Sequence, residues 1–147
     1  MRDRLGTTAT ETPRKRVLFV CIGNACRSQM AEAFARRYGS DAAEISSAGL
    51  SPASSIPELT RAVMMDKNIM LDGQSPKGIE VFPKVQWDVV VNISGQPLPQ
   101  IQAAKLIEWK IQDPIGQRQI VHERVRDEIE NLVMRLILDL RNAAKRA

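Results

Sequence analysis

Short apolar runs alternate with longer amphipathic stretches along the chain. Val17–Val20 is continuously apolar, and Trp87–Ile93 contains an unbroken run of valines; such runs are typical of strands that are covered on both faces. Glu44–Ser47 and Leu106–Ile111 are predicted as two further strands. Because parallel strands need long crossover connections, strands that alternate with helical segments predict a parallel sheet with helices on both faces.

Between these strands the apolar positions follow the helical period. Ser28–Tyr38 places Met30, Phe34 and Tyr38 on one face, and Gly39 is expected to end this helix as its C-terminal cap. Three other segments are predicted to be helical, the last of them more weakly: 57–68, 121–144 and 77–82. We therefore expect a single α/β domain over residues 15–147, with a parallel sheet between layers of helices.

Composition narrows the choice of partners. The chain has 147 residues, of which 44% are hydrophobic and 4% aromatic, so one domain with a mostly aliphatic core is expected. The net charge of +4 is spread without the basic and aromatic interleaving of nucleic-acid-binding segments, and no apolar run could span a bilayer. We expect neither nucleic acid nor membrane as a partner.

Residues 1–14 are polar, lack the apolar stretch of a signal peptide and are interpreted as a disordered leader. Two cysteines five positions apart give no disulfide framework and favour a reducing cytoplasm.

The segment Cys21-Ile-Gly-Asn-Ala-Cys-Arg-Ser28 joins the first predicted strand to the first predicted helix. The N-terminus of a helix presents unpaired N–H groups and a partial positive charge, which bind anions and stabilise a thiolate. Arg27 adds a planar set of donors that suits a tetrahedral oxyanion. A cysteine nucleophile and an oxyanion site on one loop predict covalent catalysis on phosphate or a chemically similar anion.

These residues resemble a known family. Val17–Glu32 is similar to the phosphate loop, with its flanking strand and helix, of the low molecular weight protein tyrosine phosphatases and of the arsenate reductases built on the same fold. Ser46–Gly49 resembles the end of their second strand, Trp109–Gly116 their Asp-Pro loop, and Arg124–Ile129 the start of their C-terminal helix. The resemblance covers residues 15–142 and implies a four-stranded parallel sheet with the phosphate loop after the first strand.

The resemblance also implies a role for each residue of this loop. Cys21 would attack phosphorus and form a phosphocysteine, Ser28 would donate to the thiolate, and Asp113 would act as general acid and then as general base. Asn24 would adopt a left-handed backbone conformation, and the Arg27 side chain would hold the oxyanion. No metal or other cofactor is required. The phosphate-binding residues are then Ile22, Gly23, Asn24, Ala25, Cys26, Arg27 and Ser28.

Two departures from the family leave the reaction open. Relatives that act on phosphotyrosine line the site with aromatic rings, whereas this chain has Ile115 after the Asp-Pro pair and no aromatic residue in Leu50–Ile56. Thioredoxin-coupled arsenate reductases use two further cysteines after the third strand, whereas here Ser94 stands near the first such position and Val89–Lys110 contains no cysteine. The main interpretation is metal-independent hydrolysis of phosphomonoesters, on phosphotyrosine proteins or small aryl phosphates. The alternatives are reduction of arsenate, with an external small thiol or Cys26 as the resolving thiol, and a non-catalytic oxyanion-binding or redox module.

Three further side chains carry expectations. Cys26 is equally consistent with a residue that packs the loop and with a reversible disulfide partner of Cys21. His122, the single histidine, is expected on the solvated side of the C-terminal helix. Glu32 is interpreted as an ordinary carboxylate on a helix face, with anchoring of the loop or of a monovalent cation as the alternative.

Overall fold

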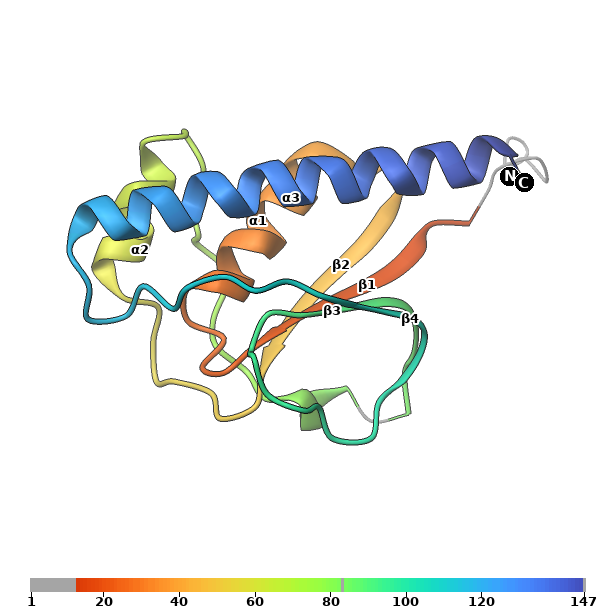
Figure 1. Ribbon diagram of the computed structural model, residues 1–147, viewed down its shortest axis with the longest axis horizontal. Coiled ribbons are helices and arrows are strands. Elements are labelled where there is room, and N and C mark those ends of the chain that lie inside the picture. Colours follow the sequence, from red (N-terminus) through yellow and green to blue (C-terminus); the bar gives the residue numbers. More distant parts are fainter. Residues whose placement is uncertain (1–12, 83, 147) are drawn as a thin grey trace.

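A parallel sheet and three α-helices make up the fold (Figure 1). The computed structural model of the chain describes residues 13–82 and 84–146. The predicted leader therefore lies outside the described residues, apart from Pro13 and Arg14. The elements in chain order are β1 (Lys15–Cys21), α1 (Arg27–Gly39), β2 (Ala43–Gly49), α2 (Glu58–Met65), the 3-10 helix η1 (Ile79–Val81), β3 (Gln86–Asn92), β4 (Gln102–Glu108) and α3 (Gln119–Arg146).

The strand order of the sheet is β2-β1-β3-β4, and every neighbouring pair is parallel. Cys21 pairs with Gly49, Val20 with Asn92, and Asn92 with Glu108, so the carboxyl ends of all four strands meet at one edge. In open α/β sheets this edge is where ligands bind. The predicted fold class, with the loop of interest directly after the first strand, is confirmed.

The two faces of the sheet are covered differently. Alternate residues of β1 point to opposite faces, and Phe19 packs with α1, α2 and α3 in the larger apolar core, while Leu18 and Val20 belong to a smaller one. The smaller core is covered by η1 and by loop residues, and Figure 1 shows the three α-helices on one side of the sheet and η1 on the other. Helices were expected on both faces; on the second face the described residues supply only the single turn of η1.

Element bounds differ from the expected ones where apolar runs do not mark them. β4 begins at Gln102, four positions before the predicted start, because it is an edge strand whose mostly exposed side chains form no apolar run. Ile111 is buried but lies beyond β4, in the chain that leads back to the sheet edge. α2 ends at Met65 rather than near Asn68, which adopts a left-handed backbone conformation with φ 60°. No helix among the described residues is long and apolar enough to cross a membrane.

Gly39 has a different role from the expected one. It is the last residue of α1, and the cap residue that follows it, Ser40, has right-handed helical backbone angles, so Gly39 supplies no left-handed turn. A Cβ at Gly39 would instead collide with the side chain of Ile137 on α3. The missing side chain therefore lets α1 and α3 approach closely.

We expect Gly39→Ala to lower the free energy of unfolding by about 1–3 kcal/mol, because the added methyl group must displace Ile137 in a packed core. In a helix without such a neighbour the same substitution stabilises by roughly 0.5–1 kcal/mol. Chemical denaturation of Gly39→Ala, Ile137→Ala and the double variant measures this difference. Gly39→Ala should be neutral or stabilising in the Ile137→Ala background, and an equal loss in both backgrounds would contradict the contact.

Candidate active site

Cys21 ends β1, and its thiol lies within the loop that connects β1 to α1. The Sγ atom is 2.8 Å from the Ser28 Oγ, and both side chains are buried. The Asn24 Nδ2 donates to the same Ser28 Oγ over 2.7 Å. Because an amide nitrogen can only donate, the Ser28 oxygen accepts from Asn24, and its own hydrogen remains free to point at the Cys21 sulfur. The expected Ser28–Cys21 contact is therefore present, in the orientation that stabilises a thiolate.

Asn24 holds the loop in its shape. Its backbone φ of 49° lies in the left-handed region, as expected. Its Nδ2 also donates to the Ser47 Oγ on β2, at 2.9 Å, and its Oδ1 accepts from the backbone N–H of Lys77 at 3.0 Å. The Gln29 Nε2 donates to both the backbone oxygen and the Oδ1 of Asn24. One residue thus connects the loop to β2, to α1 and to the segment before η1.

Glu32 is part of this buried network rather than an ordinary carboxylate on a helix face, and its contacts favour the alternative expectation that it anchors the loop. Its side chain is 3% exposed, Ser47 donates to its Oε1, and Arg36 lies 2.8 Å from its Oε2. The Lys77 Nζ lies 4.0 Å from Oε1. A buried carboxylate is tolerated only when it is paired and hydrogen-bonded, and these partners meet that condition. Glu32 therefore anchors the loop through Ser47 and Asn24.

The segment after β2 forms one wall of the site. The backbone N–H groups of Leu50, Ser51 and Ala53 donate to the carbonyls of Cys21, Ile22 and Gly23, respectively. A Cβ at Gly49 would lie 2.7 Å from the Ile22 oxygen and 2.8 Å from the Asn24 nitrogen, so only glycine fits behind the loop.

α1 begins at Arg27, directly after the loop. The residue at its N-cap position, Cys26, makes no capping hydrogen bond with its side chain. The first-turn N–H groups of such a helix form an anion-binding site. The Arg27 Nη1 donates to the carbonyls of Ile93 and Ile111, at 2.8 and 3.1 Å, so the guanidinium is held against the ends of β3 and of the chain after β4.

Asp113 lies beside Arg27, as its predicted role requires. Its Oδ2 is 3.6 Å from the Arg27 Nη2, its side chain is 44% exposed, and its Oδ1 accepts from the backbone N–H of Ile115. The Ile115 and Ile22 side chains are exposed. Arg27 and Asp113 are therefore brought together, at the edge of the sheet where Cys21 ends β1.

Cys26 faces away from solvent. Its Sγ is 3.0 Å from the Thr60 Oγ1 on α2, and burial raises the pKa of the thiol to about 11, partly opposed by the Thr60 hydrogen bond. Both cysteines are free thiols. The contact with Thr60 fits the expectation of a residue that packs the loop.

The expectation for His122 is wrong. The imidazole is 3% exposed, on the first turns of α3, and its Nδ1 has no hydrogen-bond partner among the described residues. Burial lowers the pKa of the imidazole, partly opposed by the backbone of Pro114 and Gln117 and by the charge of Asp113. A single histidine in a charged helix gave no signal of burial, because the apolar stripe begins only at Val125.

Sequence reasoning also missed other residues of the site. Gln29 and Thr60 are fully buried polar side chains that contact the loop residues Asn24 and Cys26, and Gly49 lies directly behind the loop. The only hint in the sequence that Gln29 is buried was its place beside the apolar Met30 on the first predicted helix. Among residues 13–82 and 84–146, no group of three His, Cys, Asp or Glu side chains is arranged to hold a metal ion.

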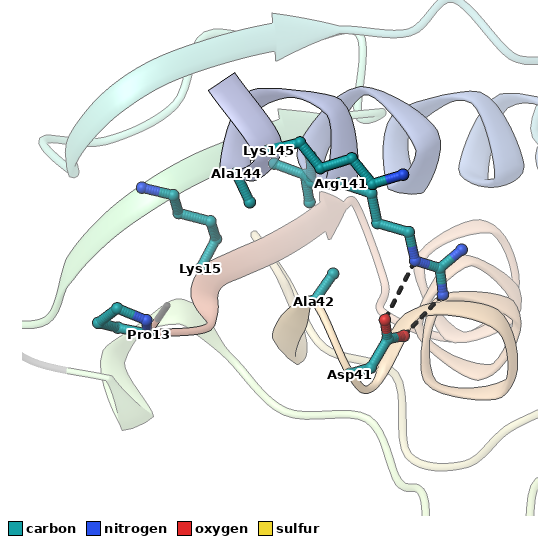
Figure 2. A pocket seen from close by; sticks show the side chains of 8 residues that line it. Pro13, Lys15, Asp41, Ala42, Arg141, Ala144 and Lys145 are labelled. Atoms are coloured by element: carbon teal, nitrogen blue, oxygen red, sulfur yellow. Dashed lines mark hydrogen bonds and ion pairs between the residues drawn. The ribbon is translucent and has the colours of Figure 1, made fainter. Parts of the chain in front are cut away.

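A separate cavity of about 220 Å³ lies at the opposite end of β1 (Figure 2). Arg141 of α3 binds Asp41 there through two contacts of 2.6 and 3.1 Å, and Lys15 and Lys145 also line the cavity. Because Lys15 begins β1 and Cys21 ends it, this cavity is not part of the candidate active site.

Comparisons with known proteins agree with the geometry. Residues 16–146 match the family described as low molecular weight phosphotyrosine protein phosphatase. A glutaredoxin arsenate reductase from Synechocystis sp. is 34% identical over 130 residues, which are 83% of this chain and 98% of the relative. Arsenate reductase 1 from Bacillus cereus is 34% identical over 120 residues, 79% of this chain and 89% of the relative. A solved structure of an arsenate reductase in the phosphate binding state has a TM-score of 0.78 and 32% identity, and covers 86% of this chain and 98% of that one.

The family match includes β1 with its loop, the Asp113 turn and α3, which are the elements that build the site. The resemblance seen in the sequence is confirmed, and the chain belongs to the low molecular weight phosphotyrosine protein phosphatase family.

Proposed function

We propose that this protein is an arsenate reductase in which Cys21 attacks arsenate and an external small thiol supplies the electrons. The observation that carries the proposal is an oxyanion site beside aliphatic side chains: Cys21, Ser28 and Arg27 with exposed Ile22 and Ile115. A tetrahedral inorganic anion needs the loop and the arginine but no aromatic wall. The proposal reverses the order of the two interpretations drawn from the sequence, and the relatives named arsenate reductases, at 31–34% identity, support this order.

The first chemical step joins sulfur to arsenic. The Cys21 Sγ attacks arsenic(V) and an S–As bond forms. The As–O bond to a hydroxyl group of arsenate breaks, and this hydroxyl takes one proton from Asp113 and leaves as water. The first-turn N–H groups of α1 and the Arg27 side chain hold the remaining oxygens.

The second step carries the reduction. The thiolate of an external small thiol attacks the Cys21 Sγ, an S–S bond forms, and the S–As bond breaks with its electron pair passing to arsenic, which leaves as arsenite. A second thiol then attacks the mixed disulfide, frees the Cys21 thiolate and completes the oxidation of two thiols to one disulfide.

Cys26 is a poor resolving thiol in this scheme. With the pKa of its thiol raised to about 11, only about one molecule in ten thousand carries the thiolate at neutral pH. Its hydrogen bond to Thr60 further engages the sulfur. These observations favour the external thiol over the intramolecular alternative.

Hydrolysis of phosphomonoesters is the second candidate function, on phosphotyrosine proteins or small aryl phosphates. It is supported by Asp113, whose carboxylate lies 3.6 Å from the Arg27 side chain and is open to solvent. In that position it could protonate an ester oxygen as the P–O bond breaks, and then take a proton from the water that attacks the phosphocysteine. The same site could therefore run both reactions at different rates.

We expect Cys21→Ser to abolish arsenite formation from arsenate with added glutathione, because the S–As bond can no longer form. The matched control is Cys26→Ser, which keeps a hydroxyl for Thr60 and should retain activity within about threefold. Arsenite release and phosphate release from p-nitrophenyl phosphate are measured on the same preparations. Loss of reduction in Cys26→Ser would make Cys26 the resolving thiol. Phosphate binding without turnover of either substrate would leave a non-catalytic oxyanion-binding module.

Asp113→Asn should lower kcat for p-nitrophenyl phosphate by about 10²-fold or more, because the leaving oxygen loses its proton donor. Gln112→Ala is the matched control on the same exposed turn and should retain wild-type kcat. Steady-state kinetics of both variants, with phosphate as a competitive inhibitor to monitor binding, test the assignment. An unchanged kcat in Asp113→Asn would remove Asp113 from the mechanism.

Ile115→Tyr should raise kcat/KM for p-nitrophenyl phosphate by about 3- to 10-fold, because an aromatic side chain beside the site can stack on the substrate ring. The kinetics of arsenate reduction, whose substrate has no ring, should stay within about twofold. Kinetics with both substrates make the comparison. An equal change for the two substrates would show that residue 115 does not govern aryl recognition.

A further inference from the structure

A closed ring of hydrogen bonds follows the end of β3. The Asn92 Oδ1 accepts from the backbone N–H of Ser94 at 3.0 Å and from the Ser94 hydroxyl at 2.6 Å. The Asn92 Nδ2 donates to the Gln96 oxygen at 2.8 Å, and the Gln96 N–H donates to the Ser94 Oγ at 3.0 Å. Asn92 and Ser94 are 3% and 5% exposed, so the carboxamide is held in one orientation inside a buried turn.

The same turn holds the side chain of Arg27. The Arg27 Nη1 donates to the carbonyl of Ile93 at 2.8 Å, and the Ile93 N–H donates to the Val20 oxygen at the end of β1. Nη1 carries two hydrogens, and the carbonyl of Ile111 accepts the second at 3.1 Å. The hydrogens of Nε and Nη2 are therefore the ones that the guanidinium can direct at an oxyanion.

One rigid group links these two sets of contacts. The Ile93 carbonyl and the Ser94 N–H belong to the same trans peptide unit, in which the atoms lie in one plane and the C=O and N–H point in opposite directions. Because the Asn92 Oδ1 accepts from this N–H, the direction of the carbonyl toward Arg27 is set as well. Loss of that acceptor would allow the peptide to turn about the bonds on either side of it.

We infer that Asn92 is a positioning residue: its carboxamide fixes the peptide between Ile93 and Ser94, and the carbonyl of this peptide aligns the Arg27 guanidinium for the oxyanion. The inference rests on the proposed function in one respect, that Arg27 binds the oxyanion. It assigns Asn92 no contact with arsenate or phosphate, and it applies equally to reduction and to hydrolysis.

Two variants that differ by one oxygen atom test this role. Asn92→Ser keeps a hydroxyl that can accept from the N–H two residues further along, whereas Asn92→Ala keeps no acceptor. The control is Val91→Ala, which removes buried methyl groups from the preceding position of β3 in the main core. Titration calorimetry measures the dissociation constant of inorganic phosphate, arsenite formation with glutathione measures turnover, and thermal denaturation measures folding.

We expect Asn92→Ala to raise the dissociation constant of phosphate about 10-fold, because the guanidinium loses the carbonyl that aligns it. Asn92→Ser should stay within about threefold of the unsubstituted protein, and Val91→Ala should lower the melting temperature without changing phosphate binding. Arg27→Lys removes the planar set of donors, so in that background Asn92→Ala should weaken binding by less than about twofold.

Unchanged phosphate binding in Asn92→Ala would overturn the inference. Equal losses in Asn92→Ala and Asn92→Ser would do the same, as would an undiminished loss in the Arg27→Lys background. If Asn92→Ala does not fold, Asn92→Thr and Asn92→Val make the same comparison, since these two side chains have nearly the same shape and both favour strands.

Failure of the proposed function gives a different pattern. The unsubstituted protein would then form no arsenite, while the phosphate dissociation constants of the Asn92 variants would still follow the expected order. Unchanged phosphate binding in Arg27→Lys would overturn the inference together with the oxyanion-binding role of Arg27.

Discussion

The carboxamide of Asn24 donates to the hydroxyls of Ser28 and Ser47 and accepts from the backbone N–H of Lys77. These contacts hold a left-handed backbone that most side chains would resist, and they leave the hydrogen of Ser28 directed at the Cys21 sulfur. The chain of contacts ends at the buried carboxylate of Glu32 and its cationic partners. A polar network of this kind is stable only when each member is satisfied, so the site has one shape rather than several.

Much of this arrangement could be predicted from the sequence. The parallel sheet followed from the spacing of apolar runs. The place of Cys21 and Arg27 on a loop between a strand and a helix followed from the local pattern, and the resemblance to the family implied the left-handed backbone of Asn24. Local patterns contain such information because the end of β1 and the start of α1 are separated by only a few residues, with Asn24 between them.

The features that could not be predicted depend on contacts between segments that are distant in the sequence, and no local pattern indicates such contacts. β4 lies at the sheet edge, where neither burial nor alternation marks its start. Glu32 is buried against Ser47 of the distant strand β2, and His122 is buried although it stands among charged residues of α3. In the sequence both residues therefore look like ordinary charged or polar positions of their helices. Gly39 was predicted to cap α1, but it lies at a close contact between α1 and α3. Glycine is favoured in both situations, so the sequence alone did not distinguish them.

The connections of Arg27 also determine when the site can form during folding. Its two carbonyl partners lie 66 and 84 positions further along the chain, and the partner of Cys26 lies 34 positions away. Contacts of such sequence separation close only after much chain entropy has been lost, so the strands and helices around them must already be in place. Ser28 contacts the Cys21 sulfur from only seven positions away, but the Arg27 guanidinium gains its partners only when the end of β3 and the segment after β4 have reached the sheet. Catalytic competence is therefore a property of the completed fold, and a partly folded chain carries a cysteine without its oxyanion site.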